Sequence, residues 1–139
     1  MVRIGKGYNW EMSHRLPFHK GDCINIHGHS YKMLVVLEGD VNENRMLIDF
    51  YDIDKLVNPL LSQLDHAFLV DSNDTEIIDF LDSKGFKKYV MNDFSTAEDI
   101  SKYILEHLKP KMAEFDNISF MKIRIYETID AWAESETKL

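Results

Sequence analysis

The first third of the chain carries two long stretches of apolar character separated by a polar loop. Alternating or continuous apolar residues occupy Ile4–Arg15 and Ser30–Gly39, with Val, Tyr, Trp and Met prominent among them. Polar residues over Asp40–Asn44 supply a turn before a short apolar run at Met46–Ile48. Because β-branched and aromatic residues between turn-forming residues are typical of strands, the pattern predicts an antiparallel sheet here.

A helical pattern follows over Asp52–Leu64. Its apolar residues recur every three or four positions, which is the spacing of one helical face. They are Ile53, Leu56, Val57, Leu60, Leu61 and Leu64. Pro59 lies inside this segment and predicts a kink or a restart, because proline lacks a backbone N–H and clashes with the preceding turn.

The middle of the chain carries weaker signals. The pattern predicts a polar stretch after Asp65-His66, a short helix over Thr75–Lys84 closed by a glycine, and a short apolar segment at Tyr89–Met91. The part from Asp71 to Asn92 resembles an insertion, where substrate selectivity or packing could differ.

The last third predicts a helix and a strand pair. Ser95 and Glu98 have the Ser-x-x-Glu spacing of a capping box, which opens a helix that ends near Pro110. Ile118–Tyr126 alternates as a strand, and a hairpin is expected to continue it through Trp132. Two strand pairs, each accompanied by a helix, predict an α+β fold, and the length of 139 residues predicts a single domain over 1–139.

Charge and composition narrow the class of protein. A formal net charge of -8 argues against nucleic acid as a partner, since nonspecific binding to phosphates needs clustered Lys and Arg. The longest apolar run, Met33–Leu37, is far too short to span a bilayer, so no membrane partner is expected. Cys23 is the only cysteine, which excludes an internal disulfide. We expect a cytoplasmic protein.

The candidate chemistry lies in the first third, around His27-Gly28-His29. On an extended backbone, residues i and i+2 point to the same side, so His27 and His29 can present two imidazoles to one ion. His14, near the end of the preceding strand, supplies a third. Three imidazoles suit Zn²⁺ and leave a fourth position for water or substrate, as in catalytic sites. The alternative is that a His-x-His motif is merely polar surface.

The His-x-His motif and Cys23 each allow a further interpretation. Cupin barrels also carry His-x-His, followed by an acidic ligand four or five residues later, but Met33 and Leu34 stand at those positions. Cys23 is either a small buried apolar group or a reactive thiol. Beside a divalent cation the thiolate would be favoured, which suits Cys23 to act as a general base.

Six elements in order resemble the 6-pyruvoyl-tetrahydropterin synthase and 6-carboxytetrahydropterin synthase family over nearly the whole chain. They are Ser13-His14-Arg15-Leu16, Cys23 with His27-Gly28-His29, Ile48-Asp49-Phe50, Leu64-Asp65-His66, Thr96-Ala97-Glu98 and Tyr126-Glu127-Thr128. The resemblance implies the tunnelling fold, an antiparallel four-stranded sheet with helices packed on one face. It also implies a pterin triphosphate substrate, 7,8-dihydroneopterin triphosphate, and a homo-oligomer, trimer or hexamer, whose subunits share active sites.

The resemblance also assigns roles to residues. Asp65 and His66 resemble the proton-relay pair of the family, although a helix-terminal charge pair would look the same. Glu127 resembles the pterin anchor and a member of the relay, because a carboxylate accepts two parallel hydrogen bonds. Its alternative is a strand carboxylate paired with Lys122 or Arg124.

Other substrate contacts are less specific. Thr96 and Glu98 are candidate substrate-binding residues, but the capping box alone accounts for Glu98. Arg15, His19 and Lys20 are candidates for the triphosphate. The chain departs from many relatives by carrying Val70 where they have Asn and Ser95 where they have Pro.

The family divides by product. The resemblance favours a lyase of the branch that releases acetaldehyde and triphosphate to give 6-carboxytetrahydropterin, an early step toward 7-deazaguanine and queuosine. The alternative is triphosphate elimination to the pyruvoyl product of the tetrahydrobiopterin pathway. A third, folate-directed branch uses a glutamate as base, and Cys23 argues against it. A hypothesis of another class is a noncatalytic module that binds a structural metal and works by assembly.

Overall fold

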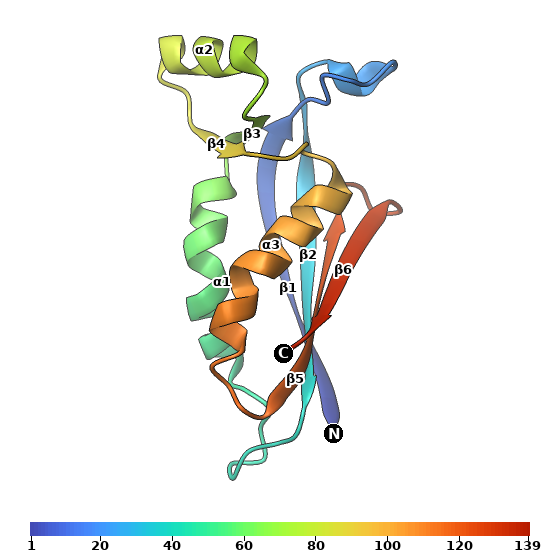
Figure 1. Cartoon of the computed structure of the whole chain (residues 1–139), viewed down its shortest axis with the longest axis vertical. Coiled ribbons are helices and arrows are strands. Elements are labelled where there is room, and N and C mark those ends of the chain that lie inside the picture. The colour runs from blue at the N-terminus through green and yellow to red at the C-terminus, as the bar shows by residue number, and fades with distance from the viewer.

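One six-stranded sheet organises the computed structural model, which describes residues 1–139 (Figure 1). The strands are β1 (Val2–His14), β2 (His27–Gly39), β3 (Ala67–Asp71), β4 (Lys88–Met91), β5 (Ile118–Tyr126) and β6 (Trp132–Lys138). The helices are α1 (Phe50–Leu64), α2 (Thr75–Lys84) and α3 (Ala97–Met112), and a short 3-10 helix, η1, covers Asp22–Ile24. The strand order is β4-β3-β1-β2-β5-β6.

The predicted antiparallel four-stranded sheet is present and is extended by two more strands. β2 pairs antiparallel with β1 and with β5, and β5 pairs antiparallel with β6. On the other side of β1, β3 and then β4 add in parallel. The sheet therefore has six strands rather than the four expected, and the two additional ones are short.

β3 lies in a segment that the pattern assigned to a polar stretch, and that assignment was wrong. All five residues of β3 are buried. A parallel strand covered on both faces shows a continuous apolar run instead of alternation, and Ala67-Phe68-Leu69-Val70 is such a run. The other short run, Met46–Ile48, forms no strand, and its Leu47 and Ile48 are buried in the loop before α1.

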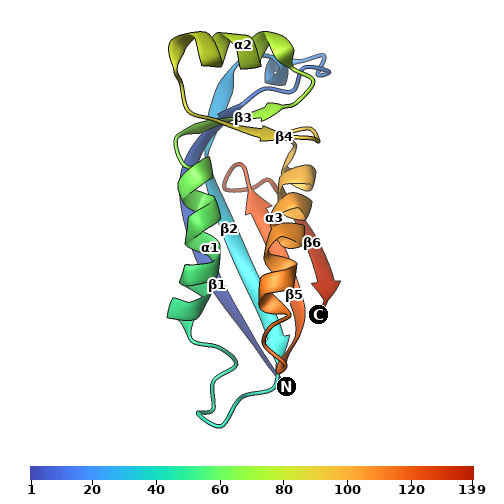
Figure 2. The ribbon, with the colours of Figure 1, turned by 60° about the vertical axis from the view of Figure 1, so that its left-hand side comes forward.

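α1 and α3 lie side by side on one face of the sheet and cover the main core (Figure 2). Alternate residues of the central strands point toward them, since neighbouring strand residues face opposite sides. These core residues include Trp10, Met12, Tyr31, Met33, Val35, Met121, Ile123 and Ile125. The rings of Trp10 on β1 and Tyr31 on β2 stack with their centroids 5.5 Å apart, so aromatic packing joins the two strands on the core face.

α2 belongs to the end of the sheet that carries β3 and β4 (Figure 1). Phe68 and Val70 of β3 form a small separate cluster with Ile77 and Leu81 of α2, whereas Leu69 between them belongs to the main core. The expectation of helices on one face thus holds for α1 and α3, and α2 covers the opposite face of β3. This packing gives the Asp71–Asn92 segment a structural role.

Both helices that contain proline continue past it. α1 extends from Phe50 to Leu64 through Pro59 without the restart that was predicted, and α3 passes Pro110 and ends at Met112. Burial of one apolar face stabilises a helix more than a single missing hydrogen bond weakens it. None of the helices combines the length and apolar composition needed to cross a membrane.

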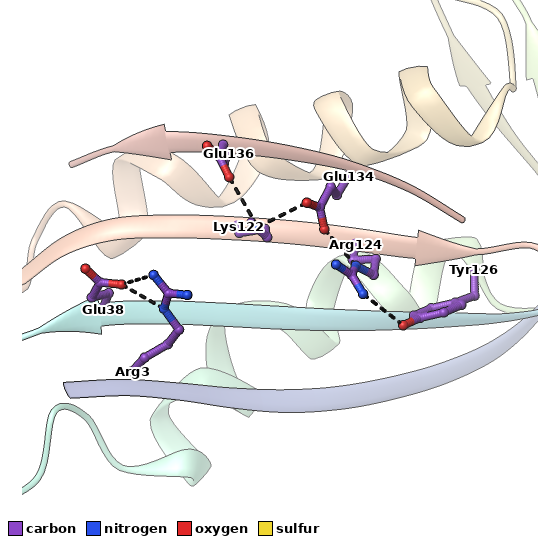
Figure 3. Close-up of polar contacts among 7 residues, drawn as sticks. All are labelled: Arg3, Glu38, Lys122, Arg124, Tyr126, Glu134 and Glu136. Atoms are coloured by element: carbon purple, nitrogen blue, oxygen red, sulfur yellow. Dashed lines mark hydrogen bonds and ion pairs between the residues drawn. The ribbon is translucent and has the colours of Figure 1, made fainter. Parts of the chain in front are cut away.

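The sheet face turned away from α1 and α3 carries cross-strand ion pairs (Figure 3). Nε of Arg3 on β1 lies 2.7 Å from the carboxylate of Glu38 on β2. Glu134 on β6 accepts from Nζ of Lys122 at 3.0 Å and from Nε of Arg124 at 2.7 Å. Opposite charges on neighbouring strands favour the observed register, because like charges placed opposite one another would destabilise it.

Gly39, where the β2–β5 register shifts, is the position least tolerant of a side chain. A Cβ atom built there would lie 2.0 Å from the backbone oxygen of Asn117 and 2.9 Å from Cα of Ile118. We therefore expect Gly39→Ala to lower the free energy of unfolding by about 1–3 kcal/mol, the usual cost of overpacking. Urea denaturation measures this difference.

Gly7 supplies the control, because it lies on the neighbouring strand β1 and a Cβ there would come no closer than 3.9 Å to any atom. Gly7→Ala should leave the urea midpoint nearly unchanged. Equal stability of the Gly39→Ala and wild-type proteins would show that the backbone at Asn117 moves aside at no measurable cost.

Candidate metal centre and active site

The pairing of β1 with β2 brings three histidines to one end of the sheet. His14, the last residue of β1, pairs with His27, the first residue of β2, and His29 pairs with Met12. Because alternate residues share a face, all three imidazoles lie on the side covered by α1 and α3. Their ligand atoms lie within 4.8 Å of one another. We call these three residues the histidine triad.

Gly28 allows the two strands to approach closely between the two histidines of β2. A Cβ at this position would lie 3.0 Å from the backbone oxygen of Met12 and 3.5 Å from Cα of Ser13. Any larger residue would press on the end of β1, which carries His14. The glycine of the His-Gly-His motif therefore protects the geometry of the triad rather than only separating two side chains.

Backbone carbonyl groups fix the ring orientation of two triad members. Nδ1 of His14 lies 2.8 Å from the carbonyl oxygen of Ser95, and Nδ1 of His27 lies 2.8 Å from that of Asn25. A carbonyl oxygen only accepts, so each Nδ1 carries the proton and each Nε2 keeps a free lone pair. Metal-binding histidines are typically held in this way.

The environment favours the neutral imidazoles of His14 and His29, the form that metal binding requires. His14 is 1% exposed, and burial lowers its pKa to about 4, with smaller lowering effects of His27 and His29. Burial also lowers the pKa of His29. Three imidazole nitrogens, two of them on rings with a fixed tautomer, are a donor set that fits Zn²⁺ and leaves a fourth position free of protein ligands.

Glu127 lies next to the triad, in the loop that follows β5. Its carboxylate is 4.0 Å from Nε2 of His29. Burial raises the pKa of Glu127, the nearby carboxylate of Glu98 raises it further, and His27 lowers it. Glu127 and His29 both line a cavity of about 730 Å³ that extends over β2 and the β5–β6 turn. Asn9, Ser30 and Lys32, which also line this cavity, face away from α1 and α3, so the cavity meets the triad only at His29.

The start of α3 differs from the predicted capping box by one residue. The N-cap is Thr96, whose hydroxyl accepts from the N–H of Asp99 at 3.2 Å. Ser95 therefore lies before the helix and does not cap it, and Glu98 does not close a capping box. A capping box therefore does not account for Glu98. The hydroxyl of Thr96 caps the helix instead.

Cys23 lies in η1, on the loop that joins the two histidine-bearing strands. Its backbone oxygen accepts from the N–H of Leu16 at 2.8 Å, which ties the middle of the loop to its beginning. The thiol is partly exposed and does not belong to the group of ligand atoms formed by the triad. The structure thus places Cys23 on the same connection as the triad but not among its ligands.

Asp65 and His66 form a pair at the end of α1. Nδ1 of His66 lies 3.0 Å from Oδ1 of Asp65, which also accepts from the N–H of Glu11 at 3.0 Å. The Glu11 N–H, and then His66, lower the pKa of Asp65. His66 has a φ of 58°, which is rare for residues other than glycine and marks a constrained position.

The Asp65–His66 pair lies beside strand residues that face the opposite side of the sheet from His14 and His27. His66 lines a hollow of about 370 Å³ that is also lined by the triad member His29 and by the outward-facing strand residues Glu11, Ser13 and Ser30. These strand residues alternate with the triad positions and face away from α1 and α3. Sequence order could not reveal this separation, since both groups lie at the same end of β1.

The three basic candidates for a triphosphate contact differ in availability. Arg15 makes a bidentate ion pair with the buried Asp74, with Nε and a terminal nitrogen each 2.7 Å from a carboxylate oxygen. Nδ1 of His19 accepts from the N–H of Gly21 at 2.9 Å. Lys20 is exposed. Arg15 therefore has a structural partner, and Lys20 is the most available cation of the three.

Sequence reasoning missed two residues beside the triad. Tyr31 is fully buried, and its hydroxyl lies 3.4 Å from both ring nitrogens of His14. Tyr31 follows His27 and His29 at the same spacing of two, and this spacing predicts that all three side chains share one face of the strand. Ser95 contacts His14 from the opposite direction, and no local pattern connects residues so far apart in the chain.

Comparison with known proteins places this geometry among pterin enzymes. Residues 3–138 match the family model described as 6-pyruvoyl tetrahydropterin synthase. The chain is 32% identical over 142 residues to a 6-carboxy-5,6,7,8-tetrahydropterin synthase of Haemophilus influenzae, covering 96% of this chain and 98% of the relative.

Solved structures of low sequence identity share the fold. An uncharacterized protein from Wolinella succinogenes superposes with a TM-score of 0.82 at 20% identity, covering 96% of this chain and 97% of that chain. A catalytic-residue mutant of the 6-pyruvoyltetrahydropterin synthase of Plasmodium vivax superposes with a TM-score of 0.78 at 18% identity, covering 99% and 98%. The expected α+β tunnelling fold is confirmed.

Proposed function

Because the chain belongs to the 6-pyruvoyl tetrahydropterin synthase family and is a lyase, we propose that it converts 7,8-dihydroneopterin triphosphate to 6-carboxy-5,6,7,8-tetrahydropterin. The reaction consumes one water, and acetaldehyde and triphosphate are the other products. The observation that carries the proposal is the histidine triad, with two tautomers fixed by carbonyl groups and the carboxylate of Glu127 4.0 Å from His29.

The choice of the carboxy-forming branch rests on the relatives. The curated relative from Haemophilus influenzae carries that name, at 32% identity over nearly the full length of both chains. The structural neighbour from Plasmodium vivax, named for the pyruvoyl product, is 18% identical and supports the fold alone. The pyruvoyl reaction is the alternative, and the histidine triad with Cys23 is compatible with either branch of the family.

Different residues of this chain are assigned to metal binding, pterin binding and proton removal. His14, His27 and His29 would hold the metal, which supplies Lewis acidity to the hydroxyl groups of the substrate side chain. Glu127 faces the cavity with a raised pKa and can accept hydrogen bonds from the amino and ring N–H groups of a pterin. Cys23 acts as the general base that removes the proton.

The Asp65–His66 pair supports a shared active site in a homo-oligomer, a trimer or hexamer. His66 shares a hollow with His29, but Cys23, His14 and His27 do not line it, so we assign the relay to the pair of a second copy. The exposed edge strand β6 offers backbone groups for such an assembly. The proposal includes a cytoplasmic enzyme of queuosine biosynthesis, to which the single reduced cysteine is suited.

The experiment is incubation of the zinc-loaded protein with 7,8-dihydroneopterin triphosphate, with acetaldehyde assayed enzymatically and the pterin identified by mass. Acetaldehyde together with 6-carboxytetrahydropterin supports the proposal. A pyruvoyl product without acetaldehyde assigns the chain to the alternative branch. A folded, metal-bound protein that turns over neither product would instead favour a noncatalytic metal-binding module.

A further inference from the structure

Ser95 is a buried serine that bridges the metal centre and the beginning of α3. It is 2% exposed and directly precedes the N-cap residue Thr96. Its carbonyl oxygen lies 2.8 Å from Nδ1 of His14, and its hydroxyl oxygen lies 3.2 Å from the same nitrogen. The hydroxyl also lies 3.2 Å from the backbone oxygen of Arg15.

The donors and acceptors of these contacts can be assigned without ambiguity. Both carbonyl oxygens only accept, so the hydroxyl of Ser95 donates to the oxygen of Arg15 and Nδ1 of His14 carries a proton. That proton is shared between the carbonyl oxygen and the hydroxyl oxygen of Ser95. The side chain of Ser95 therefore uses its donor and an acceptor site to join His14 to the residue that follows it.

We infer that Ser95 is a positioning residue for the metal centre: it holds the ring of His14 with Nε2 directed toward the ion. The inference rests on the proposed metal site and deepens it. Ser95 is not a ligand, because its hydroxyl is engaged by Nδ1 of His14 and the backbone oxygen of Arg15. It acts by fixing both the tautomer and the rotation of a ligand that arrives from β1.

The position of His14 makes this support consequential. His14 is the buried member of the triad, while His27 and His29 are partly exposed. Loss of a hydrogen-bond partner behind a ligand typically weakens metal binding by about 10- to 100-fold. Ser95→Ala removes the hydroxyl but keeps the carbonyl contact, so we expect a loss of zinc affinity at the lower end, about 10-fold.

Ser101, on the helix α3 that follows Ser95, offers a matched control. It is fully buried, and its hydroxyl donates to the carbonyl oxygen of Glu98 at 2.8 Å and lies 2.8 Å from the hydroxyl of Ser135. Ser101→Ala therefore removes a buried, doubly engaged hydroxyl that does not contact the triad. Both alanine variants should lose similar stability, but only Ser95→Ala should lose metal affinity.

The experiment titrates metal-free full-length wild type, Ser95→Ala, Ser95→Thr and Ser101→Ala with Zn²⁺ against a chromophoric chelator. The visible spectrum of bound Co²⁺ reports the ligand geometry in parallel. For Ser95→Ala we expect weaker zinc binding than wild type and an altered cobalt spectrum. Ser95→Thr keeps a hydroxyl and should bind zinc more tightly than Ser95→Ala does. Ser101→Ala should show wild-type values.

Two results would overturn the inference while leaving the metal site intact. One is equal zinc affinity of Ser95→Ala and wild type, and the other is an equal loss in Ser101→Ala, which would indicate general loosening of α3. A wild-type protein that binds no Zn²⁺ in the same titration would overturn the proposed metal centre, and the role of Ser95 with it.

Discussion

Replacing His27 with alanine is expected to weaken zinc binding by about 10²- to 10³-fold and to abolish turnover. The free energy of zinc binding at structural sites, about 10–16 kcal/mol, shared among four ligands gives about 2.5–4 kcal/mol for each. His27 is only partly buried, so its loss should spare the fold, unlike the loss of His14. Isothermal titration of the metal-free protein with Zn²⁺ measures the change.

The control for this variant is His107→Ala. His107 lies on α3, stacks on Tyr103 and takes no part in the triad. Its replacement should leave zinc affinity at the wild-type value. Retention of wild-type zinc affinity by His27→Ala would mean that the ion, if bound, is held elsewhere, and the proposed metal centre would have to be abandoned.

Replacing Cys23 with alanine is expected to reduce kcat by about 10²- to 10⁴-fold, which is the usual contribution of a positioned general base. Zinc content should stay at the wild-type level, because the thiol stands outside the group of metal ligands. Thermal stability should also stay close to wild type, since η1 contains no buried residue. Acetaldehyde release under saturating substrate measures kcat, and metal analysis accompanies it.

The two variants together separate metal binding from proton transfer. His27→Ala should lose both zinc and turnover, whereas Cys23→Ala should lose turnover alone. Cys23→Ser is a further comparison, because a hydroxyl is a much weaker acid than a thiol and should not restore the rate. Unchanged kcat in Cys23→Ala would identify the cysteine as a packing residue and leave the reaction without its proposed base.

The repeating patterns of the sequence were sufficient for the main sheet and the triad. Alternation over β1 and β2 predicted both strands, and the same period of two placed His27 and His29 on one face. The apolar spacing of α1 predicted that helix, although Pro59 was expected to interrupt it. These features follow from interactions between residues close in sequence, which a local pattern can record.

Features that depend on distant segments could not be predicted in the same way. The start of α3 was placed at Ser95, because Ser-x-x-Glu and Thr-x-x-Asp overlap and only the packed structure selects Thr96 as the cap. The hydroxyl of Ser95 contacts His14 and is therefore not available to cap the helix, which leaves Thr96 as the N-cap. The sides on which Asp65 and His66 face were equally hidden, because they depend on how β3 joins β1.

Strand pairing assembles the histidine triad, so substitutions anywhere along β1 and β2 that disturb the pairing can affect it. His14 and His27 meet because β1 and β2 pair without interruption from Val2↔Gly39 to His14↔His27. A slip of one residue would turn every side chain of the slipped strand to the other face and remove His14 from the triad. If the triad holds zinc as proposed, zinc affinity should respond to changes made near Val2 and Gly39, at the end of the β1–β2 pair that lies farthest from the triad.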